Sequence, residues 1–159
     1  MATSGQTPVP PPQLTRILST TDFSPSADIA VQWAAMLAQR FEAQLILLNV
    51  IDLSFLLVPA LPASGPIVYA DYDVLHSFRE EAKRQMEQVQ QRYPKALTKI
   101  REGSPRPVIL EEAVDVGANL IVMGTHGRSG LAHMLIGSVA EHVVRHSKIP
   151  VLTVPLPKE

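Results

Sequence analysis

Glycine is concentrated in one short stretch of the chain. Four of the eight glycines, Gly124, Gly127, Gly130 and Gly137, fall within 14 of the 159 residues, where even spacing would place roughly 0.7 of a glycine. The stretch follows an apolar run and leads into a helix expected to start near Ser138. Glycines let backbone N–H groups approach a ligand closely, and a helix N-terminus carries unpaired N–H groups and a partial positive charge. The pattern predicts a binding site for an anion such as phosphate.

Two common phosphate-binding loops do not fit this chain. A Walker A loop needs Gly-Lys followed by Ser or Thr, and the sequence has no Gly-Lys pair. A dinucleotide fingerprint follows the first strand, but residues 19–24 read Ser-Thr-Thr-Asp-Phe-Ser and contain no glycine. The anion site therefore belongs to another class.

The elements that must position this loop follow from the hydrophobic pattern. Short apolar runs predict buried strands, and amphipathic segments predict helices. Strands are expected at 14–20, 45–50, 96–101, 120–123 and 150–154, and helices at 25–41, 71–92, 105–116 and 139–146. Strict alternation of this kind predicts an α/β fold: a five-stranded, mostly parallel, doubly wound sheet of Rossmann-like type, with helices on both faces. Ligands bind such sheets beyond the carboxyl ends of the strands, where the strand order reverses.

Local signals mark the helix ends and the expected buried positions. Ser24 is expected to cap the first helix, with Pro25 in its first turn, and Gly117 is expected to stop the third. The buried faces are expected to contain Ala30, Trp33, Ala34, Leu37 and Phe41 in the first helix, Leu75, Phe78, Ala82, Met86 and Val89 in the second, and Ile109, Ala113 and Val116 in the third. The charged residues of the second helix are expected to form a solvated face.

The length fits a single domain at 14–159, preceded by a proline-rich segment, 1–13, that is expected to be a disordered tail. The N-terminus lacks the pattern of a signal peptide, so a cytoplasmic location is expected. The apolar segment 51–70 is interrupted by Pro59, Pro62 and Pro66, which argues against a membrane-spanning helix.

Composition excludes several classes of function. The chain has 14 Lys and Arg against 15 Asp and Glu, a net charge of −1, and no basic run, so no nucleic-acid partner is expected. It has no cysteine, which excludes disulfides, Cys-ligated zinc, iron–sulfur clusters and thiol catalysis.

The glycine stretch also carries a family resemblance. Gly124-Thr-His-Gly127, nine further residues and Gly137-Ser138 give the spacing Gly-x2-Gly-x9-Gly-Ser, which resembles the nucleotide-binding pattern of the universal stress protein family. The similarity extends through residues 19–24, 49–52, 120–131 and 137–146 to 150–152, which is nearly the whole domain.

This resemblance implies an adenine-nucleotide site. In the ATP-binding members of the family, the aspartate after the first strand and the backbone at the end of the second strand contact the adenosine, and the glycine loop and the serine hold the sugar and phosphates. The resemblance implies that Asp22 and Val50 are the adenosine contacts here and that Ser138 is the serine. The expected nucleotide-binding residues are Thr20, Asp22, Val50, Met123, Gly124, Gly127, Arg128, Gly137, Ser138 and Val139. A Mg²⁺ ion would be held mainly by the phosphates of ATP, with little help from protein carboxylates, so no protein metal site is expected.

Three positions depart from the family pattern. Thr20 stands where the family often has proline, Asn49 where it often has histidine, and Asn119 where it has aspartate. These changes leave the phosphate contacts in place and affect the expected shape of the adenine pocket and the support of the loops.

Several of these residues also have structural interpretations. Asp22 could cap the first helix, Gly130 could serve as a loop hinge, and Arg128 could be a solvated side chain. His126 and His133 flank the loop, but a metal pair would need a third ligand.

The leading functional hypothesis is a small cytoplasmic dimer that binds ATP and whose nucleotide occupancy changes a surface used by a regulatory protein partner that the sequence does not identify. One alternative is a slow ATPase or phosphotransferase, for which Asp52, His126 and Ser138 could act as a base or position a water molecule. Another alternative is a dimeric interaction protein that works without nucleotide.

The last strand suggests how a dimer could form. Residues 149–157 carry no charge, and an apolar strand with an open edge is normally paired or covered. Antiparallel pairing of 150–155 with a second copy would bury Val151, Leu152 and Val154, and similar proteins of the family dimerise in this way. The alternative is that the strand is internal or is covered by 51–70.

Overall fold

The structure, a computed structural model, describes residues 12–53, 72–126 and 136–157. The described chain alternates strictly between strands and helices, as the sequence predicts. In chain order the elements are β1 (Arg16–Thr20), α1 (Pro25–Phe41), β2 (Gln44–Ile51), α2 (Tyr72–Arg92), β3 (Leu97–Glu102), α3 (Pro105–Asp115), β4 (Leu120–Gly124), α4 (Ser138–His146) and β5 (Val151–Val154). Residues 1–11 of the expected tail and 54–70 of the long connection lie outside the described residues.

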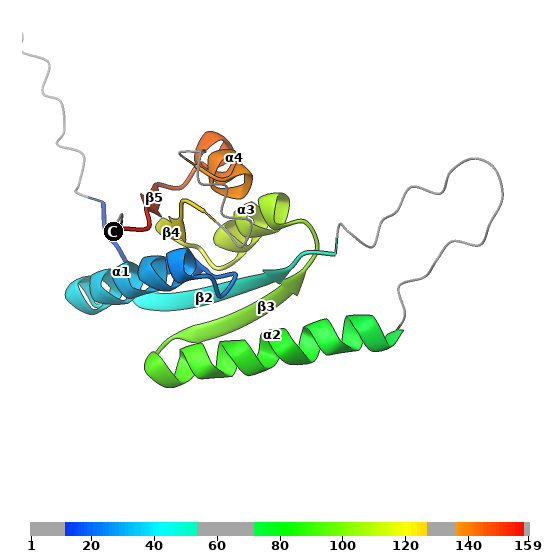
Figure 1. Ribbon diagram of the computed structural model, residues 1–159. Coiled ribbons are helices and arrows are strands. Elements are labelled where there is room, and N and C mark those ends of the chain that lie inside the picture. The colour runs from blue at the N-terminus through cyan, green and yellow to red at the C-terminus, as the bar shows by residue number, and fades with distance from the viewer. Residues whose placement is uncertain (1–11, 54–71, 127–135, 158–159) are drawn as a thin grey trace, which may run out of the picture.

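The five strands form one sheet in the order β3-β2-β1-β4-β5, and all four strand pairs are parallel. The predicted α/β fold is confirmed, with a fully parallel sheet. The strand order reverses at β1, because β2 and β3 lie on one side of it and β4 and β5 on the other. Helices α1 and α2 cover one face of the sheet, and α3 and α4 cover the other (Figure 1).

Two apolar cores sandwich the sheet because side chains alternate along each strand. Ile17 of β1 and Leu47 of β2 pack toward α1 and α2, whereas Leu18 and Leu48 pack toward α3 and α4. All four side chains are completely buried. Strands buried on both faces explain why the sequence shows continuous apolar runs rather than alternation.

Helix α1 begins and ends as its sequence indicates, but its buried face is made of smaller residues than expected. The Ser24 side chain caps the helix by accepting a hydrogen bond from the Ala27 N–H at 3.2 Å. The buried residues of the helix are Ser26, Ala27, Ala30, Val31, Ala34 and Ala38. Trp33 and Phe41 remain 48% and 56% exposed, so the prediction that they belong to the core was wrong. Trp33 lies about 100° around the helix from Ala34, and Phe41 is the last helical residue.

The other helices largely follow their predicted faces. Helix α2 buries Ala82, Met86 and Val89, but Phe78 is 40% exposed, which corrects its assignment to the core. Helix α3 buries Ile109 and Ala113 and is followed by Gly117 at a φ of 63°, the left-handed conformation expected of a glycine helix stop. Val116 is half-buried against the same core.

Strand β5 lies at the edge of the sheet, as predicted. Its Val154 is already buried within the subunit, and Leu152 packs against the core on the α1 side. The expectation that pairing with a second copy would bury Val154 was therefore wrong.

In the described part of the chain, no helix is both long and apolar enough to span a bilayer.

Candidate functional site

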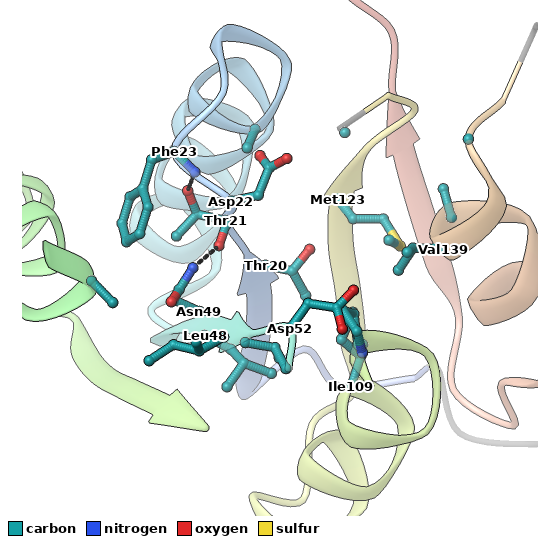
Figure 2. Close-up of a pocket in the computed structure, with 18 of the residues that line it drawn as sticks. Thr20, Thr21, Asp22, Phe23, Leu48, Asn49, Asp52, Ile109, Met123 and Val139 are labelled. Atoms are coloured by element: carbon teal, nitrogen blue, oxygen red, sulfur yellow. Dashed lines mark hydrogen bonds between the residues drawn. The ribbon is translucent and has the colours of Figure 1, made fainter. Parts of the chain in front are cut away.

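A cavity of about 400 Å³ opens at the carboxyl end of the sheet, beside the point where the strand order reverses. The ends of β1, β2 and β4 form its floor, and the starts of α3 and α4 and one face of α2 contribute walls (Figure 2). Eight of the ten expected nucleotide-binding residues line it: Thr20, Asp22, Val50, Met123, Gly124, Gly137, Ser138 and Val139. The other two, Gly127 and Arg128, lie outside the described residues, as do Gly130 and His133.

The part of the cavity next to α3 and α4 has mainly apolar walls. Val50, Ile109, Met123 and Val139 line it and belong to, or pack against, the core on that side of the sheet. Figure 2 shows Met123 and Val139 on one side of the cavity, with Thr20 and Asp52 facing them. An apolar slot with polar groups at its rim suits a flat ring system that carries hydrogen-bonding groups.

The loop between β1 and α1 places Asp22 at the cavity. Its Oδ1 atom accepts hydrogen bonds from the Ser24 N–H at 3.1 Å and the Ser24 hydroxyl at 2.6 Å. Ser24, not Asp22, is the residue that caps α1. Asp22 therefore supports the cap and lines the cavity at the same time, and the two interpretations of this residue are compatible.

Gly124 is required by packing. A Cβ atom at this position would lie 2.6 Å from Ser26 Oγ and 3.0 Å from the Ser26 carbonyl carbon and oxygen. The end of β4 therefore approaches the first turn of α1 more closely than any side chain permits. From the sequence, glycine is expected at this position because it lets an anion reach the backbone. The structure adds a second, steric reason for glycine here.

The N-terminus of α4 faces the cavity. Ser138, Val139 and Ala140 of its first turn line the cavity, and Ser138 is exposed. The N-cap residue is Gly137, whose φ of −74° is ordinary and which offers no side chain to bond the first-turn N–H groups. The Gly137 N–H instead donates to the Thr125 carbonyl at 2.6 Å, which ties the start of α4 to the end of β4. These features make the helix start a suitable place for an anion.

Polar side chains at the ends of β2 and β4 complete the site. Asp52 and His126 both line the cavity, and His126 Nδ1 lies 2.9 Å from the Thr125 hydroxyl oxygen. Among the described residues, no group of three or more His, Asp or Glu side chains is arranged to hold a metal ion.

Helix α2 supplies a wall that the sequence analysis missed. Phe78, Glu81, Ala82 and Gln85 line the cavity, and the Gln85 side chain donates a hydrogen bond to Glu81. Helical spacing is the signal that could have revealed this wall. The four residues follow the i, i+3, i+4, i+7 spacing of one helix face.

Asn119 supports the opposite end of the sheet. Its Oδ1 atom accepts hydrogen bonds from the N–H groups of Thr15 and Arg16 at 2.8 and 2.9 Å. These bonds join the start of β1 to the residue just before β4. The departure from the family pattern at this position is therefore remote from the cavity.

An ion pair network with one buried member, Glu112, lies on α3 beyond Ile109, and its two basic partners remain partly exposed. Glu112 is completely buried and pairs with Lys99 at 2.5 Å and with Arg101, both on β3. Burial raises the pKa of Glu112, but the hydrogen bonds and charges of Lys99 and Arg101 outweigh it, so the pKa lies below its usual value. The network joins α3 to the outer strand and thereby holds one wall of the cavity.

Comparison with known proteins gives a consistent family assignment. Residues 13–155 match the model of the universal stress protein family. The chain is 31% identical over 151 residues to universal stress protein MJ0577 of Methanocaldococcus jannaschii, covering 87% of this chain and 93% of that protein.

Solved structures agree with the sequence relatives. The structure of MJ0577 superposes with a TM-score of 0.80 at 30% identity, covering 92% of this chain and 99% of the other. The universal stress protein UspA of Lactobacillus plantarum gives a TM-score of 0.76 at 29% identity, covering 91% and 99%. A universal stress protein solved in complex with cAMP gives 0.56 at 28% identity, covering 90% and 98%. The match spans nearly the full length of both the sequence and the fold, and the chain belongs to the universal stress protein family.

Proposed function

We propose that this protein binds ATP in the cavity at the carboxyl end of the sheet and acts as a nucleotide-dependent regulatory dimer. The observation that carries the proposal is the convergence of eight expected nucleotide-binding residues from four separate segments of the chain on one cavity. A related structure with bound cAMP, also an adenine nucleotide, supports the choice of ligand class.

The described residues fit the two ends of an adenine nucleotide. The apolar side chains of Val50, Met123 and Val139 suit the faces of a base, and Asp22 supplies a carboxylate that accepts hydrogen bonds from the nucleoside. The N-terminus of α4 suits the phosphates, because its first-turn N–H groups and partial positive charge favour an anion.

Mg²⁺ would be held chiefly by the phosphates of the nucleotide in this proposal. Asp52 is the carboxylate at the end of β2 that lines the cavity. A hard cation that keeps several water ligands needs one or two protein carboxylates at most. Mg²⁺ would neutralise phosphate charge, while the chain itself binds and orients the nucleotide.

The dimer would form through the open edge of β5. The Ile121 and Thr125 N–H groups donate to the Pro150 and Val154 carbonyls, so alternate residues of β5 face β4. Val151 and Thr153 consequently direct their backbone N–H and C=O groups toward the open edge. Antiparallel pairing with a second copy would satisfy these groups, and a nucleotide bound next to β4 would lie close to that interface. The cytoplasmic location and the regulatory protein partner remain predictions from the sequence.

Two measurements test the proposal. Mass spectrometry of small molecules released from protein purified without added nucleotide should detect an adenine nucleotide. Calorimetric titration with ATP, GTP and inorganic tripolyphosphate in the presence of Mg²⁺ should show tighter binding of ATP than of the other two. Equal affinity for ATP and GTP would contradict an adenine site. If none of the three ligands bound, the proposal that the protein works through a nucleotide would be wrong. Phosphate release measured in the same samples decides whether ATP is also hydrolysed.

A further inference from the structure

Asn49 is a buried polar residue beside the cavity, on the side of the sheet covered by α1 and α2. Its side chain belongs to β2 and the residue is 5% exposed. The Nδ2 atom donates a hydrogen bond to the carbonyl of Thr21, 28 residues earlier, at 2.8 Å (Figure 2). A buried amide is costly without a partner, so this bond is a fixed feature of the site.

The bond extends the pairing of β1 with β2 by one step. Thr20, the last residue of β1, pairs with Leu48, and the Thr21 N–H donates to the Leu48 carbonyl at 2.8 Å. The Asn49 side chain then binds the Thr21 carbonyl. Two consecutive residues of β2 therefore hold both backbone polar groups of Thr21.

The chain turns sharply immediately after this anchor. Phe23 has a φ of 64°, a left-handed conformation that is strained for a bulky residue. Its N–H donates to the Thr21 hydroxyl at 3.0 Å. On the far side of the turn, Ser24 binds the Asp22 carboxylate and caps α1. Asp22 is thus held between two anchors, Thr21 and Ser24, and the first depends on Asn49.

We propose that Asn49 is a positioning residue of the nucleotide site: through the Thr21 carbonyl it sets the direction in which Asp22 presents its carboxylate to the nucleoside. The inference rests on the proposed nucleotide site. Asn49 also directly precedes Val50, so one side chain links the two segments expected to contact adenosine. An apolar residue of similar size would fill the same space but leave the Thr21 carbonyl without its donor.

The first test compares ligands that contain or lack the nucleoside. In Asn49→Leu, which keeps the size and removes the donor, ATP and adenosine should both bind about tenfold more weakly, the effect of losing one hydrogen bond. Tripolyphosphate should bind as it does to the wild type, because α4 is unchanged. Asn49→His, which keeps a ring N–H donor, should recover most of the affinity. Equal losses for ATP and tripolyphosphate would contradict the proposal.

A double-mutant cycle with Asp22→Ala separates positioning from direct contact, since Asn49 itself lines the cavity. If Asn49 acts through Asp22, Asn49→Leu should cause no further loss of ATP affinity in the Asp22→Ala background. A full, additive loss in that background would overturn the inference while leaving ATP binding in place. Absence of ATP binding by the wild type would instead remove the proposed function and the inference together.

Urea unfolding of each variant provides the structural control. A purely structural role for Asn49 would lower the free energy of unfolding and leave ATP affinity of the folded protein unchanged, which would also overturn the inference. If Asn49→Leu does not fold, Asn49→Ala removes the same donor without adding a charge and takes its place in the cycle.

Discussion

At the scale of single residues, two carboxylates held by hydrogen bonds have different tasks. Asp22 is half-buried, lines the cavity and accepts hydrogen bonds from the Ser24 hydroxyl at 2.6 Å and the Ser24 N–H at 3.1 Å. Glu112 is completely buried and forms ion pairs with Lys99 and Arg101. The first stands where a ligand can reach it, and the second joins a helix to a strand. Substitution of Asp22 should therefore affect binding in addition to the cap of α1, whereas substitution of Glu112 should affect stability.

Replacing Asp22 by alanine should weaken ATP binding by about 1–3 kcal/mol, the range for losing a hydrogen bond to a charged group. Asp28→Ala is a matched control, because it removes one acid from the same region, but Asp28 pairs with Arg92 outside the cavity. The control should bind ATP like the wild type. Calorimetric titration of folded protein measures both affinities, and equal affinities of the two variants would remove Asp22 from the site.

Replacing Glu112 by glutamine should lower the free energy of unfolding by about 1–3 kcal/mol at pH 7. Because the folded pKa of Glu112 lies below the ordinary value of 4.5, its stabilisation is complete above that value. It is lost as the pH falls through the folded pKa. The difference between wild type and variant should therefore shrink below pH 4.5.

Urea unfolding measured at intervals of about half a pH unit between pH 3 and pH 7 checks this dependence. Glu111→Gln makes the same change at the neighbouring exposed residue of α3 and should change stability little. A Glu112→Gln variant whose deficit stays constant down to pH 3 would show that the carboxylate charge is not the stabilising feature.

At the scale of secondary-structure elements, a negative charge at the start of α4 should have opposite effects on helix stability and on phosphate binding. Its first turn lacks a side-chain cap at Gly137 and faces the cavity. Charge at a helix N-terminus stabilises the helix when it is negative. The same charge would repel phosphates that approach this helix end.

Replacing the exposed Ser138 by glutamate should therefore keep or raise stability, by about 0.3–1 kcal/mol, while weakening ATP. The loss of affinity should be largest for ATP, smaller for AMP and absent for adenosine, and it should decrease with added salt. Gln39→Glu adds the same charge at an exposed position of α1 outside the cavity and should leave all three affinities unchanged. An equal loss for adenosine and ATP would mean that the phosphates do not lie at α4.

At the scale of the whole molecule, the open edge of β5 is where the proposed dimer would form. Leu152 and Val154 face the subunit's own core, so a charged residue at Leu152 would disturb folding as well as assembly. Thr153, by contrast, directs its backbone groups toward the open edge. A test of dimer formation should therefore act on Thr153.

Replacing Thr153 by proline should abolish the dimer and leave a folded monomer. Proline removes an N–H that faces the open edge, and edge strands tolerate it where no hydrogen bond of their own sheet is lost. Leu152→Pro is the matched control, since it breaks a bond to β4 and should unfold the protein. Light scattering at micromolar concentration gives the mass, and circular dichroism verifies folding. A dimeric Thr153→Pro variant would place the interface elsewhere.

The order and type of the elements could be predicted because each depends on local sequence. Ser24-Pro25 starts α1, because capping groups act within one turn. Continuous apolar runs predicted strands buried on both faces. The carboxyl edge of a parallel sheet indicated where a ligand would bind, and the family resemblance named Asp22, Val50 and Ser138, which line one cavity there although they are distant in sequence.

Tertiary packing alone decided the rest. Periodicity marked Trp33 and Phe41 as core, but α1 turns its row of small residues, from Ser26 to Ala38, toward the sheet and leaves both aromatic side chains about half exposed. The wall formed by Phe78 and Gln85 exists because α2 packs beside the carboxyl end of β2. The bond from Asn49 to Thr21 joins residues 28 positions apart. Such features depend on distances between elements, and a sequence pattern reports only the preferences of each element by itself.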